Sequence, residues 1–320
     1  MRLRDPALRS HPRRPQAGRR NHWRAGAREE RRVYVIMGGT GHAGSATADC
    51  LLARGESVTI VTRSAARADE WRGKGAGIAE ADVEDVASLR AALRLGRRAF
   101  LLNPPADTST DTDAVERRTV ANILAALDGS RLEKVVAEST GGAQPGERIG
   151  DLNVLWELEQ GLRGGPIPAA INRAAYYMSN WDGQLDAIRS TGELSTLFPA
   201  DLALPMVAPR DLGEAAAARL LSPLDDTGVR YVEGPRLYSS NDVAEAFSKA
   251  LGQPVKVKVT PRDQWKQAFL GLGFSETAAD SYARMTAVSI DGGFDLSDDP
   301  LRGTTTLDDY ISDLVARQDD

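Results

Sequence analysis

Hydrophobic residues between positions 33 and 172 fall into short runs that are separated by longer amphipathic segments. Each run is five or six residues long and rich in β-branched or small apolar side chains, which is typical of buried strands. We expect strands at 33–37, 57–62, 76–80, 98–102, 134–138 and 167–172. The segments between them predict helices near 45–54, 65–73, 86–95, 111–127 and 151–163. Strands that alternate with helices predict an α/β fold with a doubly wound parallel sheet and right-handed crossovers.

This alternation ends after Arg173. The next residues predict a helix near 178–190, an irregular segment rich in Leu and Pro at 194–209, and a helix at 211–221. A β-rich run at 229–233 is expected to be the last strand of the sheet.

The remaining residues, 240–320, predict mainly helices around one strand at 255–259. We therefore expect a dinucleotide-type α/β core at 33–235, with part of a second lobe inserted near 175–210. Residues 236–320 would complete this smaller, mostly helical C-terminal lobe. Because open α/β sheets bind ligands beyond the carboxyl ends of their strands, the lobe is expected to cover that crevice.

Charge separates the first residues from the rest of the chain. Residues 1–32 hold 11 arginines and three acidic residues, a net charge of +8, whereas 33–320 hold 29 basic and 42 acidic residues, a net charge of −13. With three prolines and no apolar run, 1–32 is interpreted as a disordered basic extension, and a functional basic arm is the alternative. An acidic body argues against nucleic acid as a partner, because binding phosphates requires a basic face.

Histidine and cysteine are scarce. Cys50 is the single cysteine, and the three histidines all lie within the first 42 residues. These counts exclude a disulfide framework, a Cys-rich or His-rich metal centre, and a Ser-His-Asp hydrolase with a late histidine. No run of about 18 apolar residues is present, so we expect no membrane span and a soluble, cytoplasmic protein.

A glycine-rich turn follows the first expected strand. It reads Gly38-Gly-Thr-Gly-His-Ala-Gly44 and leads into the first expected helix. Glycines at this spacing permit a tight turn, the approach of a pyrophosphate at Gly41, and close packing of helix on strand at Gly44. The free N–H groups at the helix start would face the phosphates. The strand–turn–helix context predicts a dinucleotide site.

The end of the second strand indicates which dinucleotide. A carboxylate there would bind a ribose 2′-hydroxyl, but the sequence reads Thr62-Arg63 and continues to Arg67. Guanidinium groups suit a 2′-phosphate, so we prefer NADP(H) over NAD(H), although two solvated arginines are the alternative. Asp82, after the third strand, is placed to meet the adenine edge or to cap a helix.

These features resemble the NmrA-like branch of the atypical short-chain dehydrogenase/reductases over most of 33–320. The resemblance is carried by the glycine turn, Thr62-Arg-Ser64, Ala81-Asp82, Leu101-Leu-Asn-Pro-Pro105, Ile171-Asn-Arg173, Tyr177-Met-Ser-Asn180, Arg210-Asp-Leu-Gly213, Val232-Glu-Gly-Pro235 and Leu251-Gly-Gln-Pro-Val255. It implies a Rossmann core with a C-terminal substrate lobe. Members include NADPH-dependent quinone and azo-dye reductases, and regulators that bind the dinucleotide without turning it over.

The resemblance also implies site residues. Carried over to matching positions, the cofactor would be held by Gly38, Thr40, Gly41, His42, Ala43, Gly44, Arg63, Arg67 and Asp82, with Asn103 and Pro104 on the nicotinamide side. The chain departs from the Tyr/Lys dehydrogenases, because no tyrosine has a lysine four residues later. Alcohol oxidation through that proton relay is therefore not expected.

Hydride transfer to a quinone-like or other conjugated acceptor needs orientation but no strong acid, since water can protonate the product. Hydroxyls, aromatic rings and an amide gather after the fifth and sixth strands, although the aromatic residues could equally be core. The expected acceptor pocket consists of Ser139, Thr140, Tyr176, Tyr177, Met178 and Asn180. Two hypotheses stay open: an NADPH-dependent oxidoreductase with a small-molecule acceptor, and a dinucleotide-sensing regulator with a protein partner.

Overall fold

The computed structural model describes residues 32–292 and 296–319, apart from the side chains of Arg67 and Asp319. The expected basic extension, 1–32, lies outside the described residues except for Arg32. The element bounds given below therefore refer to the described residues alone.

The core of the protein is an eight-stranded parallel sheet with the order β13-β10-β6-β5-β4-β1-β2-β3. Its strands are β1 (Val33–Ile36), β2 (Ser57–Thr62), β3 (Gly77–Glu80), β4 (Arg98–Leu101), β5 (Lys134–Thr140), β6 (Ala169–Ala174), β10 (Gly228–Glu233) and β13 (Leu301–Arg302). From β1 the chain first adds β2 and β3 on one side and then β4, β5 and β6 on the other. The strand order therefore reverses beside β1, and the predicted doubly wound parallel sheet is confirmed.

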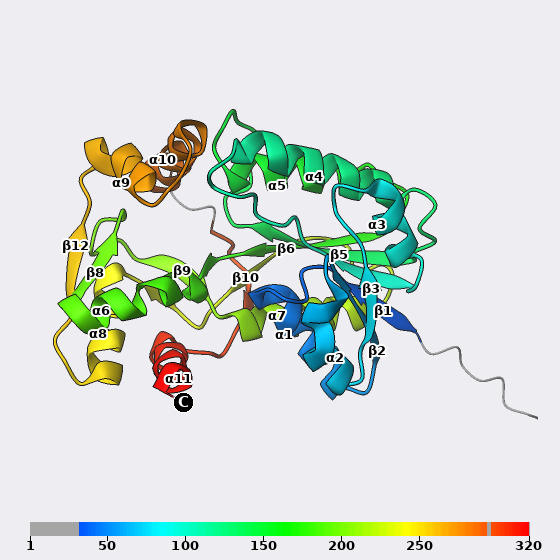
Figure 1. Ribbon diagram of the computed structural model, residues 1–320, viewed down its shortest axis with the longest axis horizontal. Helices are drawn as coiled ribbons and strands as arrows, with labels where there is room; N and C mark the ends of the chain where they lie inside the picture. The colour runs from blue at the N-terminus through cyan, green and yellow to red at the C-terminus, as the bar shows by residue number, and fades with distance from the viewer. Residues whose placement is uncertain (1–31, 293–295, 320) are drawn as a thin grey trace, which may run out of the picture. The chain divides into compact units, whose positions relative to one another are not determined.

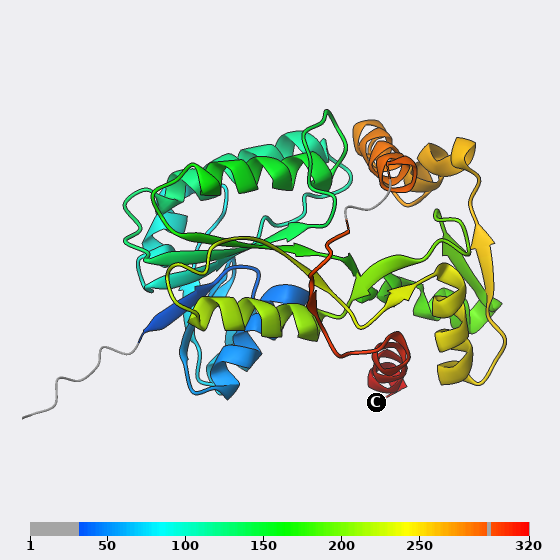
Figure 2. The same ribbon diagram turned by 180° about the vertical axis from the view of Figure 1, so that it is seen from behind.

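Helices cover both faces of this sheet, as Figures 1 and 2 show. One face carries α3 (Val86–Leu93), α4 (Thr112–Leu127) and α5 (Asp151–Arg163), and the other carries α1 (His42–Ala53), α2 (Asp69–Gly73) and α7 (Pro209–Leu221). Each layer has its own apolar core, around Ile123 and Leu158 on the first face and around Leu51 and Ala216 on the second. A Cβ at Gly213 of α7 would overlap Ala46, so glycine allows α7 to lie directly against α1.

Most expected elements are present, with shifted ends. The helix expected at 65–73 is a 3-10 helix η1 (Ala65–Ala68) followed by α2. The strand expected at 167–172 begins two residues later, because Pro168 has no N–H to donate to the ladder. Asp85 and Asp111 cap α3 and α4 by accepting first-turn N–H bonds, which explains why these helices begin where they do.

A smaller, mostly helical lobe follows β6. Its strands form two small sheets, β11-β9-β7 and β12-β8. The strands are β7 (Tyr176–Tyr177), β8 (Glu193–Thr196), β9 (Leu204–Val207), β11 (Leu237–Tyr238) and β12 (Lys256–Val259). The helices are η2 (Met178–Gln184), α6 (Leu185–Thr191), α8 (Ser240–Leu251), η3 (Arg262–Gln264), α9 (Trp265–Gly271), α10 (Glu276–Asp291) and α11 (Leu307–Asp319). A third apolar core, with Trp181 and Phe247, joins η2, α6, α8 and α11 with the strands of the lobe.

The expectation that β10 is the last strand of the sheet is wrong. Leu301 and Arg302 form β13, which pairs in parallel with Val232 and Glu233 and becomes the edge strand. A two-residue strand carries no periodicity, so the sequence pattern could not reveal it. The expected lobe range 236–320 thus includes one strand of the main sheet.

Candidate functional site

The turn between β1 and α1 is shaped by close contacts at three of its glycines, Gly38, Gly39 and Gly44. Gly38 has a φ of +67°, and a Cβ there would lie 2.6 Å from Cδ2 of Leu102. A Cβ at Gly44 would overlap the carbonyl oxygen of Gly38, so only glycine lets the helix approach the turn this closely. At Gly41 the nearest neighbour of a Cβ would be that same oxygen, at an ordinary 3.5 Å. Packing within the chain therefore does not require glycine at position 41, whereas a ligand against the backbone would.

The start of α1 offers backbone donors at this turn. Thr40, Gly41 and His42 are exposed, while Ala43 and Gly44 are buried. Within this fully described helix, no side chain caps the N-terminus and the first turn contains no carboxylate. The first-turn N–H groups thus stay open, and the helix dipole adds partial positive charge, which together favour an anion.

The turn after β2 contains a carboxylate that the sequence pattern did not place there. Arg63 is exposed at this turn, and Arg67 lies in η1 with its side chain outside the described part. Glu80, from the end of β3, accepts the N–H of Ala65 through Oε2 at 3.3 Å. Arg63 and the carboxylate of Glu80 therefore both lie at the turn that follows β2.

Asp82 is exposed at the turn that leads into α3. Its Oδ1 accepts the N–H of Glu84 at 3.0 Å, and its own N–H donates to Oγ of Ser88 at 3.2 Å. These local bonds fix the turn. The proposed contact of Asp82 with an adenine edge stays a prediction.

Asn103 follows β4 and is held by α4. Its Nδ2 donates to the carbonyl of Glu116 at 3.3 Å, and its Oδ1 accepts the hydroxyl of Thr119 at 2.6 Å. Both ends of the amide are thereby directed toward the helix. Pro104, the next residue, is half-buried beside it at the same edge of the sheet.

Ser139 belongs to a buried charge cluster and not to an open pocket. Its hydroxyl donates to Oε1 of Glu159 at 2.6 Å, and Glu159 is 1% exposed. Arg173 pairs with both oxygens of this carboxylate, at 2.9 and 2.8 Å, and donates to the hydroxyl of Tyr231. The expected role of Ser139 as a hydroxyl donor to an acceptor stays a prediction. Thr140 is half-buried and donates to the carbonyl of Gly141.

The tyrosines after β6 lie between core and pocket. Tyr176 is half-buried against the rings of Trp181 and Phe198, with centroids 5.7 and 5.6 Å away, and burial raises its pKa to about 12. Tyr177 is also half-buried, and Asn180 is exposed. Met178 is fully buried in the lobe core, and its expected place in the acceptor pocket stays a prediction.

Asp151, Tyr177 and Tyr282 are not fully buried, yet burial raises the pKa of each side chain. Asp151, at the start of α5, is an exposed residue, and Tyr177 and Tyr282 are half-buried residues. Burial is nevertheless the main cause that raises the pKa of each group, and Asp151 further raises that of both tyrosines. The influence of Asp151 on both tyrosines places these three groups near one another. We call this place, where α5, β7 and α10 meet, the acceptor-side recess.

Glu116 of α4 lies behind this recess and is 2% exposed. Burial, and secondarily the charge of Asp151, raise its pKa to about 7. Its Oε1 accepts the N–H of Ala106 at 2.9 Å. Near neutral pH this carboxyl is therefore divided between its protonated and ionised forms.

The lobe also reaches the glycine turn. Asp182 of η2 accepts the hydroxyl of Tyr310 from α11 at 2.8 Å. Burial raises the pKa of Asp182, while this hydroxyl and His42 act in the lowering direction. The influence of His42 places these lobe elements beside the start of α1, so the glycine turn is flanked by the lobe.

A comparison with family models decides what kind of protein carries this arrangement. The model described as the NmrA-like family matches residues 30–311. The chain belongs to the NmrA-like family. The resemblance inferred from the glycine turn and the Arg173–Asn180 segment is confirmed.

Relatives of this NmrA-like chain include characterised reductases. It is 26% identical to the NAD(P)H azoreductase of Xenophilus azovorans, over 80% of this chain and 87% of that protein. The triphenylmethane reductase of Citrobacter sp., solved with NADP(H), has a TM-score of 0.73 at 19% identity, over 88% of this chain and 99% of that one. The Escherichia coli quinone oxidoreductase solved with NADPH has a TM-score of 0.72 at 19% identity, with the same coverage. These two structures show that the fold is shared.

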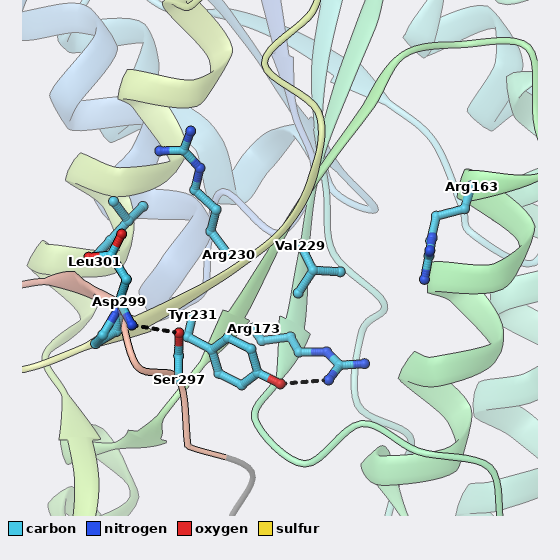
Figure 3. Close-up of a pocket in the computed structure, with 9 residues that line it drawn as sticks. Arg163, Arg173, Val229, Arg230, Tyr231, Ser297, Asp299 and Leu301 are labelled. Atoms are coloured by element: carbon cyan, nitrogen blue, oxygen red, sulfur yellow. Dashed lines mark hydrogen bonds between the residues drawn. The ribbon is translucent and has the colours of Figure 1, made fainter.

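A separate cavity of about 630 Å³ lies beside β10, as Figure 3 shows. Its lining consists of Arg163, Arg173, Val229, Arg230, Tyr231, Ser297, Asp299, Pro300 and Leu301. Strands β6, β5 and β4 separate β10 from β1, which places the cavity about 19 Å from the glycine turn at ~4.8 Å per strand. Arg173 and Arg230 already pair with Glu159 and Asp226. This cavity is therefore neither next to the dinucleotide edge nor strongly cationic.

Sequence reasoning missed Asp151, Glu116 and Tyr282. No local pattern in the sequence distinguishes these three residues from the other acids and tyrosines of the chain. Within the described ranges, no cluster of three or more His, Cys, Asp or Glu side chains could hold a metal ion. Among the same residues, no helix has the length and apolar character needed to cross a bilayer.

Proposed function

We propose that this NmrA-like protein is a cytoplasmic, NADPH-dependent oxidoreductase that reduces a quinone-like or other conjugated acceptor. The observation that carries the proposal is the glycine turn, where Gly41 leaves the backbone open although no neighbour in the chain requires it. The open N–H groups of α1 and the reversal of strand order beside β1 support a dinucleotide at this place. The family and its azoreductase relative support reduction.

The residues present fit a dinucleotide. Thr40, Gly41 and the backbone of 42–44 would hold the pyrophosphate, and Arg63 with Arg67 a 2′-phosphate. Asp82 would meet the adenine edge, and Asn103 with Pro104 would border the nicotinamide. When bound, the reduced dinucleotide supplies a hydride, so the protein has to orient the acceptor and exclude competing reactions.

The acceptor would lie in the acceptor-side recess. Tyr176, Tyr177 and Tyr282 offer aromatic surfaces, and Thr140 and Asn180 add polar groups at its border. An apolar wall with a few polar groups suits a flat conjugated ring system. Asp151 adds a carboxyl group that the sequence pattern did not suggest.

The proposal is tested on one preparation in two steps. NADPH and NADH are titrated while the quenching of intrinsic fluorescence is followed, and quinones and azo dyes are then screened by the loss of NADPH absorbance. We expect tighter binding of NADPH and turnover of at least one acceptor class. Tight binding without turnover of any acceptor would contradict an enzymatic role and favour the dinucleotide-sensing regulator.

A further inference from the structure

The small sheet formed by β8 and β12 has one edge that is closed and one that is open. Within the described part of the chain, these two parallel strands pair only with each other. A side chain closes the outer edge of β8. The amide of Gln184 donates through Nε2 to the carbonyl of Ser195 and accepts the N–H of Ser195 through Oε1, both at 2.9 Å. This amide therefore takes the place that the peptide group of a third strand would have.

The outer edge of β12 has no such cover. The N–H of Lys256 donates to the carbonyl of Gly192 at 2.8 Å, so the peptide groups of Lys256 face β8. Because successive residues of a strand point their peptide groups to opposite sides, the N–H and C=O groups of Val257 and Val259 point away from β8. Among the described residues, none of these four groups has a hydrogen-bond partner. Figures 1 and 2 show β12 at the outer margin of the lobe, with no helix or strand beyond it.

The side chains of β12 alternate between charged and apolar. Lys256 and Lys258 are exposed on one face of the strand, and Val257 and Val259 lie on the other. Lys258 pairs with Glu193 of β8 at 3.1 Å, whereas Lys256 has no ion-pair partner among the described residues. Val259 is 42% exposed. The open edge therefore presents an unpaired cation on one face and an apolar side chain on the other.

We propose that β12 binds an extended segment of a partner protein, in which acidic and apolar side chains alternate, as a third strand of this sheet. The main chain of the segment would pair with the open groups of Val257 and Val259. Its acidic side chains would lie beside Lys256 and Lys258, and its apolar side chains beside Val259. This interaction surface goes beyond the proposed function and does not depend on a bound dinucleotide.

The charge of β12 favours such a segment over a second copy of this chain. Two β12 strands that pair antiparallel about a twofold axis keep the same faces together, so the lysines of the two copies would lie beside one another and repel. Exposed lysines can also protect an edge strand from any pairing. If that is their whole role, the edge binds no peptide.

The first test measures peptide binding to the full chain by fluorescence anisotropy. The probe is a labelled peptide of about six residues in which glutamate and valine alternate. One control peptide has lysine in place of every glutamate. The other keeps the glutamates but is methylated at every peptide nitrogen, so it retains the charge and loses the main-chain donors. We expect saturable binding of the glutamate peptide and no binding of either control.

Three variants locate the site. Lys256→Glu should weaken binding of the glutamate peptide about tenfold. Val259→Pro removes an N–H that the chain itself does not use, so binding should be lost while thermal unfolding stays that of the wild type. Lys74→Glu makes the same change in charge at an exposed lysine of the core and should bind like the wild type.

Hydrogen exchange, followed by NMR, gives a second readout. The amides of Val257 and Val259 should exchange more slowly when the peptide is bound, while that of Ser195, which already donates to Gln184, should not change. Failure of the glutamate peptide to bind, equal binding of its methylated form, or unchanged affinity in Lys256→Glu would overturn the proposal. Self-association of the wild type that is lost in Val259→Pro would overturn it in favour of a second copy.

Discussion

The glycine turn is contiguous in sequence, whereas the acceptor-side recess is assembled from helices and strands that are far apart in the chain. Residues 38–44 form the turn through their own backbone and close packing at Gly38 and Gly44. The recess depends on tertiary contacts such as the bond between Gly150 and Ser281, which are 131 positions apart. The proposed cofactor turn is therefore specified by contiguous sequence, whereas the proposed acceptor region exists only in the folded protein.

The glycine turn and the acceptor-side recess also differ in which kind of substitution should disturb them. At the turn, the limiting quantity is volume, because the backbone leaves no room for a side chain at Gly44. At the recess it is charge, since Glu116, Glu138 and Asp151 all have pKa values raised by burial. The following changes probe this difference, from the largest expected effect to the smallest.

Arg173→Ala removes the cation that neutralises the most buried carboxylate behind the recess. Glu159 is 1% exposed, so it would be left as an uncompensated buried charge between α5 and β6. We expect the free energy of unfolding to fall by about 3–5 kcal/mol, measured by urea denaturation. The loss of acceptor turnover should exceed the loss of NADPH affinity.

Arg262→Ala is the matched control for this change. Arg262 also pairs with a carboxylate, Asp291, through two hydrogen bonds and lies over an aromatic ring, Trp265, but both charged side chains are about half exposed. An exposed pair contributes at most about 1 kcal/mol. Equal destabilisation by the two variants would show that the buried Arg173–Glu159 pair contributes no more to stability than the exposed Arg262–Asp291 pair.

Glu116→Gln tests the sensitivity of the recess to pH. The pKa of Glu116 is about 7 when folded and near 4.5 when unfolded, so the folded state holds the proton more tightly. Its stabilising effect is complete below about pH 4.5 and is lost as the pH rises to about 7, a change of about 3 kcal/mol. In Glu116→Gln that decline in unfolding free energy should vanish. Parallel pH curves for the variant and the wild type would contradict the assignment.

Gly44→Ala and Gly41→Ala separate folding from binding at the turn. The Cβ at position 44 overlaps the carbonyl of Gly38, so Gly44→Ala should lower stability by about 1–3 kcal/mol. The Cβ at position 41 meets nothing closer than 3.5 Å, so Gly41→Ala should unfold like the wild type. It should nevertheless bind NADPH about tenfold more weakly, by about 1.4 kcal/mol. Unchanged affinity in Gly41→Ala would remove the main support for the dinucleotide site.

The core fold could be predicted because its signals are local. Short apolar runs rich in β-branched residues predict the buried strands, and amphipathic spacing predicts the helices. Asp85 and Asp111 mark the starts of α3 and α4. The short strands β7, β11 and β13 could not be predicted, because two residues have no periodicity and pair only when distant segments meet.

The same distinction divides the candidate site. The glycine turn and the position of Arg63 after β2 could be predicted from spacing alone, but the hydrogen bond of Ser139 to Glu159 could not. A serine at a strand end looks available in sequence, and only the fold brings Glu159 under it. The same holds for Asp151, whose charge raises the pKa of Tyr177 and Tyr282 only because the fold brings these residues together.

Arg63→Asp tests whether Arg63, at the turn after β2, binds the 2′-phosphate of NADPH. If Arg63 binds the 2′-phosphate, its loss removes a charged hydrogen bond worth about 2 kcal/mol, so NADPH affinity should fall about 30-fold while NADH affinity changes little. Arg54→Asp makes the same change in charge at the far end of α1 and should leave both affinities unchanged. Equal losses for NADPH and NADH would contradict the assignment of Arg63.

Glu80→Gln should raise NADPH affinity, since this carboxylate from β3 faces the same turn.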